Sequence, residues 1–203
     1  MHIPRFILSI VLVMLAGCVS APEIKKNTNS ASQLLYQQHL QSIAAIHQFT
    51  IQGRVGVQTE GKGYSASLNW QHSLNNDDIS LYTPLGGQVA NIKRTVDKTI
   101  LEDANGNSIT AETVEDLTQS ALGWRLPLAG LADWALGRAT NRPIQSISWD
   151  EHGFLSSLKQ DGWDIQYQNY IDNNGVFLPR KILLKSEKIN LKLLVEKWNN
   201  FSD

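Results

Sequence analysis

Five histidines are the residues of this 203-residue chain best suited to bind a metal or to act as a catalytic base. They are His2, His39, His47, His72 and His152. His39 and His47 lie eight positions apart, not the four that place two zinc ligands on one helix face. The chain also contains no G-x-S-x-G nucleophile motif. We therefore expect no catalytic residue, no metal, no cofactor and no enzymatic activity.

Three other segments carry residue types that could do chemistry. Asp77-Asp78 and Asp150-Glu151-His152 could hold a metal or move protons, but each lies at the boundary of a predicted strand, where polar residues belong. Residues 61–66 match the pattern G-x-G-x-x-A. A dinucleotide site needs a helix beginning on such glycines, whereas these lead into an alternating strand. We interpret all three segments as structural.

Cys18 is the only cysteine and follows a short apolar run. Arg5 gives a positive start, and Phe6–Leu15 is shorter than the ~20 apolar residues of a transmembrane helix. Leu15-Ala16-Gly17-Cys18 resembles the bacterial lipobox, in which the cysteine sulfur takes a diacylglyceryl group. The sequence therefore predicts a signal peptide over Met1–Gly17 and a lipid anchor at Cys18.

The mature chain divides into a tether and one domain. Residues 18–32 are small and polar and predict a flexible tether, and residues 33–203 have the length of a single domain. The formal charge is −1, which argues against a nucleic-acid partner. Val19 follows the cysteine, where an Asp retains many lipoproteins in the inner membrane, so we expect the outer membrane.

Hydrophobic periodicity predicts a mainly β domain with some α-helix. Helical spacing covers Gln33–His47, Ala111–Leu122 and Leu128–Leu136. Alternation with a period of two begins at Ile51–Val57 and Tyr64–Trp70. Further strands are predicted at Ile79–Tyr82, Gln88–Lys93, Thr99–Glu102, Ile144–Trp149, Phe154–Lys159, Trp163–Asn169, Leu178–Ser186 and Ile189–Val195. We expect one curled antiparallel sheet of about eleven strands, with about three helices on its concave side.

Apolar residues are the remaining candidates for function. The chain has six tryptophans, several on apolar strand faces. Core packing is the simpler interpretation of any one of them, but an open sheet lined with such side chains also suits an acyl ligand. Leu85 lies at the apex of a predicted surface loop between two strands, flanked by the turn residues Pro84 and Gly86.

Several motifs, taken in order along the chain, resemble the LolB family of Gram-negative outer-membrane lipoproteins. They are Phe49-Thr50-Ile51-Gln52-Gly53-Arg54, Ala66-Ser67-Leu68-Asn69-Trp70, Thr83-Pro84-Leu85-Gly86, Leu126-Pro127-Leu128 with Trp134, and Leu191–Trp198. The resemblance implies an incomplete, half-open β-barrel, capped by helices, that encloses a hydrophobic cavity. It also implies a protruding loop whose apolar residue helps to place cargo in the membrane; Leu85 matches that position. Gly87 departs from the polar residue often found there.

The resemblance further implies partners and a location. The protein would accept acylated lipoprotein cargo from a LolA-type periplasmic carrier, without nucleotide hydrolysis. It would be a monomer at the cell outer membrane, facing the periplasm and held by lipid on Cys18. Strand parity selects the candidates that line the acyl cavity: Val55, Leu68, Trp70, Leu81, Trp149 and Ile165. The alternatives are a tethered structural or assembly lipoprotein without acyl transfer, and a lipid-modifying hydrolase, for which no nucleophile–base pair is evident.

Overall fold

The structure is a computed structural model that describes residues 30–123 and 125–202, and the statements below concern that part of the chain. The predicted signal peptide, Cys18, most of the tether and Trp124 lie outside it. The strands are β1 (Gln48–Thr59), β2 (Lys62–His72), β3 (Asp77–Tyr82), β4 (Gln88–Arg94), β5 (Thr99–Asp103), β6 (Ser108–Ala111), β7 (Ile144–Trp149), β8 (Leu155–Gln160), β9 (Trp163–Asn173), β10 (Val176–Lys185) and β11 (Asn190–Ser202).

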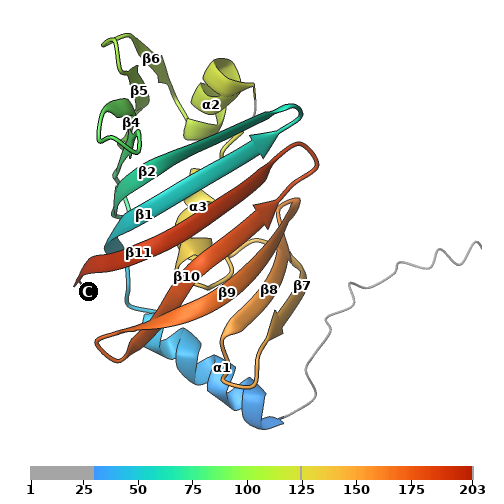
Figure 1. Ribbon diagram of the computed structural model, residues 1–203. Helices are drawn as coiled ribbons and strands as arrows, with labels where there is room; N and C mark the ends of the chain where they lie inside the picture. The colour runs from blue at the N-terminus through green and yellow to red at the C-terminus, as the bar shows by residue number, and fades with distance from the viewer. Residues whose placement is uncertain (1–29, 124, 203) are drawn as a thin grey trace, which may run out of the picture.

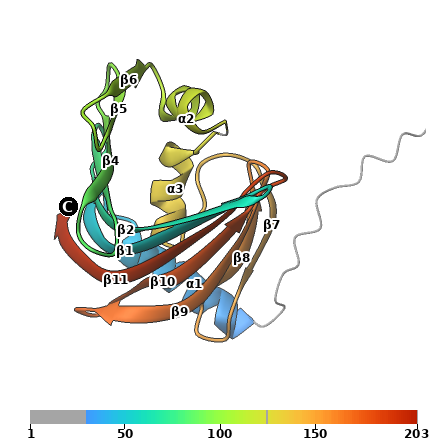
Figure 2. The ribbon, with the colours of Figure 1, turned by 45° about the horizontal axis from the view of Figure 1, so that its top comes forward.

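All eleven strands form one antiparallel sheet with the order β6-β5-β4-β3-β2-β1-β11-β10-β9-β8-β7. The first and last strands of the chain pair at the middle, and hairpins extend the sheet outward from both. Figures 1 and 2 show that the sheet curls but does not close, because β6 and β7 are its two free edges. The predicted incomplete barrel is confirmed.

A bulge in β11, where Glu196 is the extra residue between the pairs Gln52–Lys197 and Gly53–Val195, contributes to the bend at the middle of the sheet. The register between β1 and β11 shifts between Gln52 and Gly53. A Cβ on Gly53 would lie 2.1 Å from the carbonyl oxygen of Leu194, so only glycine permits this close approach of the two strands. Extra residues at bulges bend a strand and increase its twist, which a curling sheet requires.

Three helices accompany the sheet. The helix α1 (Ser30–Ile43) precedes β1, and α2 (Val114–Leu122) and α3 (Leu128–Ala135) connect β6 to β7. Thr113 caps α2 by accepting a hydrogen bond from the backbone N–H of Asp116 at 3.1 Å. Figure 2 shows α3 on the concave side of the curled sheet and α1 at the end of the sheet where β1 begins.

The two ends of the sheet are named here by their connections. The tip end has the connections 60–61, 83–87, 104–107, 161–162 and 186–189. The base end has the connections 73–76, 95–98, 150–154 and 174–175, together with α1. Strands that run antiparallel bring every second connection to the same end.

Element boundaries differ from prediction in a few places. The first helix begins three residues earlier than Gln33 and ends at Ile43, where the carbonyls of Ile43 and Ile46 accept hydrogen bonds from Arg138. The helix predicted to begin at Ala111 begins at Val114 instead, because Ala111 pairs with Thr99 in the sheet. The sequence does not predict strand β6, which is only four residues long and mostly exposed.

Candidate functional site

The six predicted cavity residues lie on one face of the sheet, here called the inner face. In the register, Gly53 stands opposite Leu68, and Leu68 opposite Leu81. Val55 and Trp70 lie on the same side by the two-residue period. The sheet has two arms, β1 to β6 and β7 to β11. On the second arm, Ile165 is opposite both Leu158 and Leu184. Leu68, Trp70, Trp149 and Ile165 are buried, and Val55 and Leu81 are partly buried against the same core.

Helix α3 covers this inner face. Its buried side chains include Leu128, Leu131 and Trp134, and they belong to the same hydrophobic cluster as the sheet residues. The indole N–H of Trp134 donates a hydrogen bond to Gln160 Oε1 at 3.0 Å, which satisfies both buried polar groups. The inner face is therefore apolar, as expected, but it is packed beneath α3. Neither hollow described here, of about 650 and about 450 Å³, is lined by any of the six residues.

Trp70 is held by a buried charged cluster at the base end. Asp77 is 3% exposed and accepts hydrogen bonds from Trp70 Nε1 and His72 Nδ1, both at 2.7 Å. Its second oxygen accepts from Arg94 Nε. Burial alone would raise the pKa of Asp77, but the hydrogen bonds from these partners outweigh it and lower the pKa. Asp77 is the first residue of β3, at the strand boundary that the sequence predicts, and it is also the centre of this cluster.

The other chemically capable residues form no site among the residues that the structure describes. No group of three His, Cys, Asp or Glu side chains there could hold a metal ion. His39 is buried in α1 against Phe154 and Tyr170, and its Nε2 has no hydrogen-bond partner in the described chain. Burial lowers the pKa of His39, although Asp150 acts in the opposite direction. His39 is thus part of an aromatic cluster under α1.

The loop 83–87 presents Leu85 to solvent at the tip end. Thr83 closes the loop: its N–H donates to Gly87 O at 2.8 Å, and its carbonyl accepts from Gly86 N at 2.9 Å. Gly86 has φ +89°, a conformation that L side chains rarely adopt. Leu85 lies between the residues that these hydrogen bonds join, and it is 99% exposed. The turn thus presents the side chain of Leu85 to solvent, as the sequence predicts for a surface loop.

Comparison with known proteins identifies the family. Residues 47–198 match the family model described as "Outer membrane lipoprotein LolB". This chain belongs to the LolB family. The LolB of Pseudomonas savastanoi pv. phaseolicola is 28% identical over 198 residues, which cover 98% of this chain and 97% of the relative. The LolB of Stutzerimonas stutzeri is 28% identical and covers 92% and 90%.

Solved structures support the fold. A LolA superfamily protein from Nitrosomonas europaea has a TM-score of 0.51 and 10% identity, covering 83% of this chain and 94% of that one. A putative outer membrane lipoprotein-sorting protein domain from Vibrio parahaemolyticus has a TM-score of 0.50 and 7% identity, covering 82% and 91%. At such low identity these likenesses concern the fold alone.

Family membership places the protein among outer-membrane lipoproteins that serve lipoprotein localisation, which are not enzymes. Within residues 30–123 and 125–202, no helix is long and apolar enough to cross a membrane. Two apolar features stand out among the described residues: the inner face beneath α3 and the exposed Leu85 of the tip end.

Proposed function

We propose that this protein accepts acylated lipoproteins from a LolA-type periplasmic carrier and inserts them into the inner leaflet of the outer membrane. The observation that carries the proposal is an apolar inner face continuous across both arms of an open sheet. Acyl chains in water cost about 25 cal/mol per Å² of exposed apolar surface, so transfer needs a surface of this kind on the receiver.

Acyl chains would enter by taking the place of α3. The helix contributes Leu128, Leu131 and Trp134 to the core, so hydrocarbon that displaces it replaces one apolar contact with another. No side-chain hydrogen bond caps its first turn. Near the other end of α3, Arg138 pairs with Asp133 and donates hydrogen bonds to the carbonyls of Ile43, the last residue of α1, and of Ile46. Helix α3 would therefore swing from its Arg138 end, without unfolding the sheet.

The remaining parts of the proposal concern location and release. The lipid on Cys18 would hold the domain at the outer membrane. The open side of the sheet would then face the periplasm, where the carrier arrives. Pro84, Leu85 and Gly86 would form the membrane-transfer loop. The transfer would run from carrier to membrane if this protein binds the acyl chains more tightly than the carrier does and the bilayer then takes them up.

A displacement assay tests acyl binding. The mature chain with Cys18→Ala is titrated with a fluorescent fatty acid, and then with a lipoprotein held by its carrier. We expect saturable probe binding, a change in tryptophan emission as hydrocarbon replaces the packing around Trp134, and removal of the lipoprotein from the carrier. A lack of saturable binding would instead favour a tethered structural or assembly lipoprotein.

A substitution in the loop separates acceptance from release. Leu85→Glu adds a charge to a side chain that is already in water, so folding and cargo acceptance should be unchanged. Insertion into vesicles should fall, because a carboxylate resists entry into hydrocarbon. Leu85→Met is the matched control and should insert cargo normally. Loss of acceptance by Leu85→Glu would show that the loop contacts the carrier or cargo instead.

A further inference from the structure

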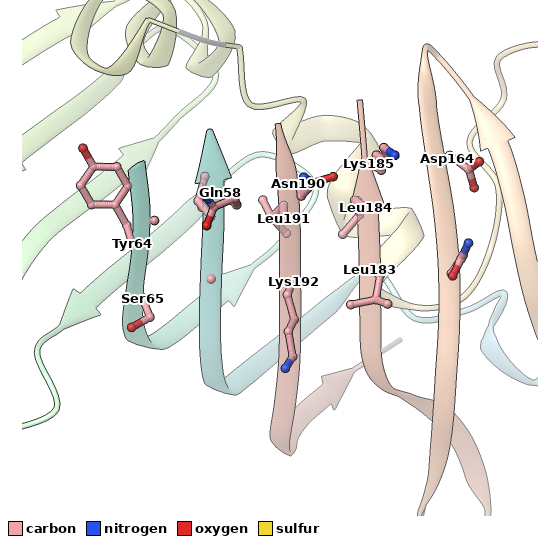
Figure 3. Close-up of a pocket in the computed structure, with 14 residues that line it drawn as sticks. Gln58, Tyr64, Ser65, Asp164, Leu183, Leu184, Lys185, Asn190, Leu191 and Lys192 are labelled. Carbon is pink, nitrogen blue, oxygen red and sulfur yellow. The ribbon is translucent and has the colours of Figure 1, made fainter. Parts of the chain in front are cut away.

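A hollow of about 650 Å³ lies at the tip end, across strands β2, β1, β11, β10 and β9 (Figure 3). Most of its lining comes from the outer face of the sheet, opposite the apolar core. In the register, Gly56 stands opposite Ser65 on one side and Lys192 on the other. Lys192 is in turn opposite Leu183, and Leu183 opposite Gln166. The hollow is therefore separate from the proposed acyl site on the inner face.

The hollow exists because β1 has a glycine where the neighbouring strands have side chains. A Cβ on Gly56 would have a single neighbour within 4 Å, the carbonyl oxygen of Tyr64 at 3.8 Å. Glycine in the interior of a strand weakens the strand and often marks a place where another molecule approaches the backbone. No close packing requires glycine here, in contrast to Gly53.

The lining of the hollow carries surplus positive charge. Lys185 and Lys192 both line it, and neither forms an ion pair within the described chain. Its acidic residue, Asp164, is already paired with Lys159 at 3.3 Å. Ser65 and Gln166 add a hydroxyl and an amide that can bond to oxygen atoms. Lys185 on β10 stands opposite Asn190, which lies two residues before Lys192 on β11, so the two lysines are diagonal neighbours on the outer face. Ser65 on β2 and Gln166 on β9 flank them. Two neighbouring ammonium groups flanked by neutral hydrogen-bonding groups suit a phosphate group.

The turns beside the hollow do not share this surplus. Glu60 lies close in sequence to Lys62, and Glu187 is next to Lys188, so acid and base alternate along the tip. The whole chain has a formal charge of −1. The positive charge of the hollow is thus a local feature that the fold assembles from separate strands.

The hollow and Leu85 lie at the same end of the sheet. Tyr82, the last residue before the loop 83–87, pairs with Ser67, so the loop leaves the sheet close to the level of Ser65. A membrane that receives Leu85 into its apolar layer would bring its headgroups to the tip end. The phosphates of phospholipids are the anions present at high density there.

We propose that this hollow binds the phosphate of a phospholipid headgroup and provides a second membrane contact besides Leu85. The proposal rests on the proposed function, since it assumes that the tip end meets a bilayer. Two contacts separated across the sheet would fix the orientation of the tip end at the membrane, which a single leucine cannot do.

Vesicle partitioning tests the proposal with the mature Cys18→Ala chain. The vesicles contain phosphatidylcholine alone or equal parts of phosphatidylcholine and phosphatidylglycerol. Lys185→Gln with Lys192→Gln should lower the partition coefficient into the mixed vesicles about 25-fold, or about fivefold for each lysine. The matched control, Lys98→Gln with Lys197→Gln, makes the same change of charge at the base end. It should change partitioning by less than about twofold, because those lysines lie beyond a Debye length from the surface.

Gly56→Thr tests the hollow itself without changing charge. The new side chain would fill open space and suits a β-strand, so the free energy of unfolding should be unchanged or higher. Partitioning into the mixed vesicles should nevertheless fall as far as in the double lysine variant. Unchanged partitioning of a folded Gly56→Thr chain would overturn the proposal, and so would equal binding of the wild type to vesicles of an uncharged, phosphate-free lipid.

Two further readouts identify the source of any failure. Inorganic phosphate at the same phosphate concentration should compete weakly; full displacement by it would assign the hollow to free phosphate instead of a headgroup. The fatty-acid probe is titrated in parallel. A lysine variant that binds the probe normally but partitions like the wild type would overturn only the headgroup site. A wild type that binds no probe would overturn the proposed acyl function and leave the partitioning result to stand alone.

Discussion

At the base end, Trp70, His72 and Arg94 converge on one buried carboxylate, and Arg138 donates hydrogen bonds to the carbonyls of Ile43, the last residue of α1, and of Ile46. At the tip end, Leu85 is almost fully exposed, and two lysines that form no ion pair among the described residues line a hollow. The buried interactions that stabilise the fold are thus concentrated at the base end, and the exposed apolar and charged side chains at the tip end. This separation lets the tip present an apolar side chain and charge without weakening the fold.

Removal of the Asp77 carboxylate should have the largest effect on stability. Asp77→Ala leaves Arg94 partly buried without its partner and the indole N–H of Trp70 unsatisfied. We expect a loss of about 3–5 kcal/mol in the free energy of unfolding, measured with urea. Glu60→Ala, at the tip end, should change it by less than about 0.5 kcal/mol. Equal effects of the two substitutions would contradict the contrast between the ends.

The same carboxylate predicts a pH dependence for the base end. The pKa of Asp77 is lowered from its ordinary value of 3.8. A lowered folded-state pKa stabilises the protein above the unfolded-state pKa, and this stabilisation is lost as the pH falls through the folded-state value. The advantage of the wild type over Asp77→Asn should therefore be constant near neutral pH and shrink below pH 3.8. Urea unfolding of both proteins across this range measures it, and a difference that grows on acidification would contradict it.

Two arginines provide the next comparison. Arg138 pairs with Asp133 at 2.7 Å and donates to the carbonyls of Ile43 and Ile46. Arg138→Ala should cost about 2–3 kcal/mol, because these carbonyls lose a charged donor. Arg142 meets Asp161 at the tip end at only 3.8 Å, and its side chain is 71% exposed. Arg142→Ala should therefore cost less than about 0.5 kcal/mol by thermal unfolding.

Two tyrosines of β9 sharpen the contrast within a single strand. The hydroxyl of Tyr170 donates to the carbonyl of Leu155 at 2.8 Å, whereas the buried hydroxyl of Tyr167 has no partner in the described residues. Tyr170→Phe should lower the free energy of unfolding by about 1 kcal/mol. Tyr167→Phe should leave it unchanged or raise it. The reverse order in urea titrations would show that the two hydroxyls are bonded differently.

The smallest effect on stability is expected at Leu85. Its side chain contacts solvent almost everywhere, so Leu85→Glu should change the free energy of unfolding by less than about 0.5 kcal/mol. Urea unfolding at neutral pH provides the value. A loss above about 1 kcal/mol would mean that Leu85 packs against the domain.

The sequence predicts the inner face well, because strand parity depends only on local alternation. Val55, Leu68 and Trp70 share a face for this reason, and Pro84 and Gly86 mark a turn that exposes Leu85. The Asp77 cluster could not be predicted in this way. Arg94 lies 17 positions from Asp77, and their contact depends on the register of neighbouring strands.

Two other features also depend on long-range contacts. Arg138 bonds to Ile43, 95 positions away, so the end of α1 is set by a residue that no local pattern connects to it. The hollow needs Gly56 and Lys192 side by side, which follows only from the pairing of the first strand with the last. Neither the Arg138 contact nor the hollow can be predicted from the types of the residues alone.

An incomplete barrel is exposed to aggregation in a way that a closed barrel is not, because each free edge strand can pair with a strand of another molecule. Both edges here limit such growth. Strand β6 is four residues long, and β7 is six residues long with its register interrupted between Ile144 and Ser146 and between Ser148 and Trp149. Neither offers a long, regular template for fibre-like assembly, so a sheet with two free edges need not polymerise.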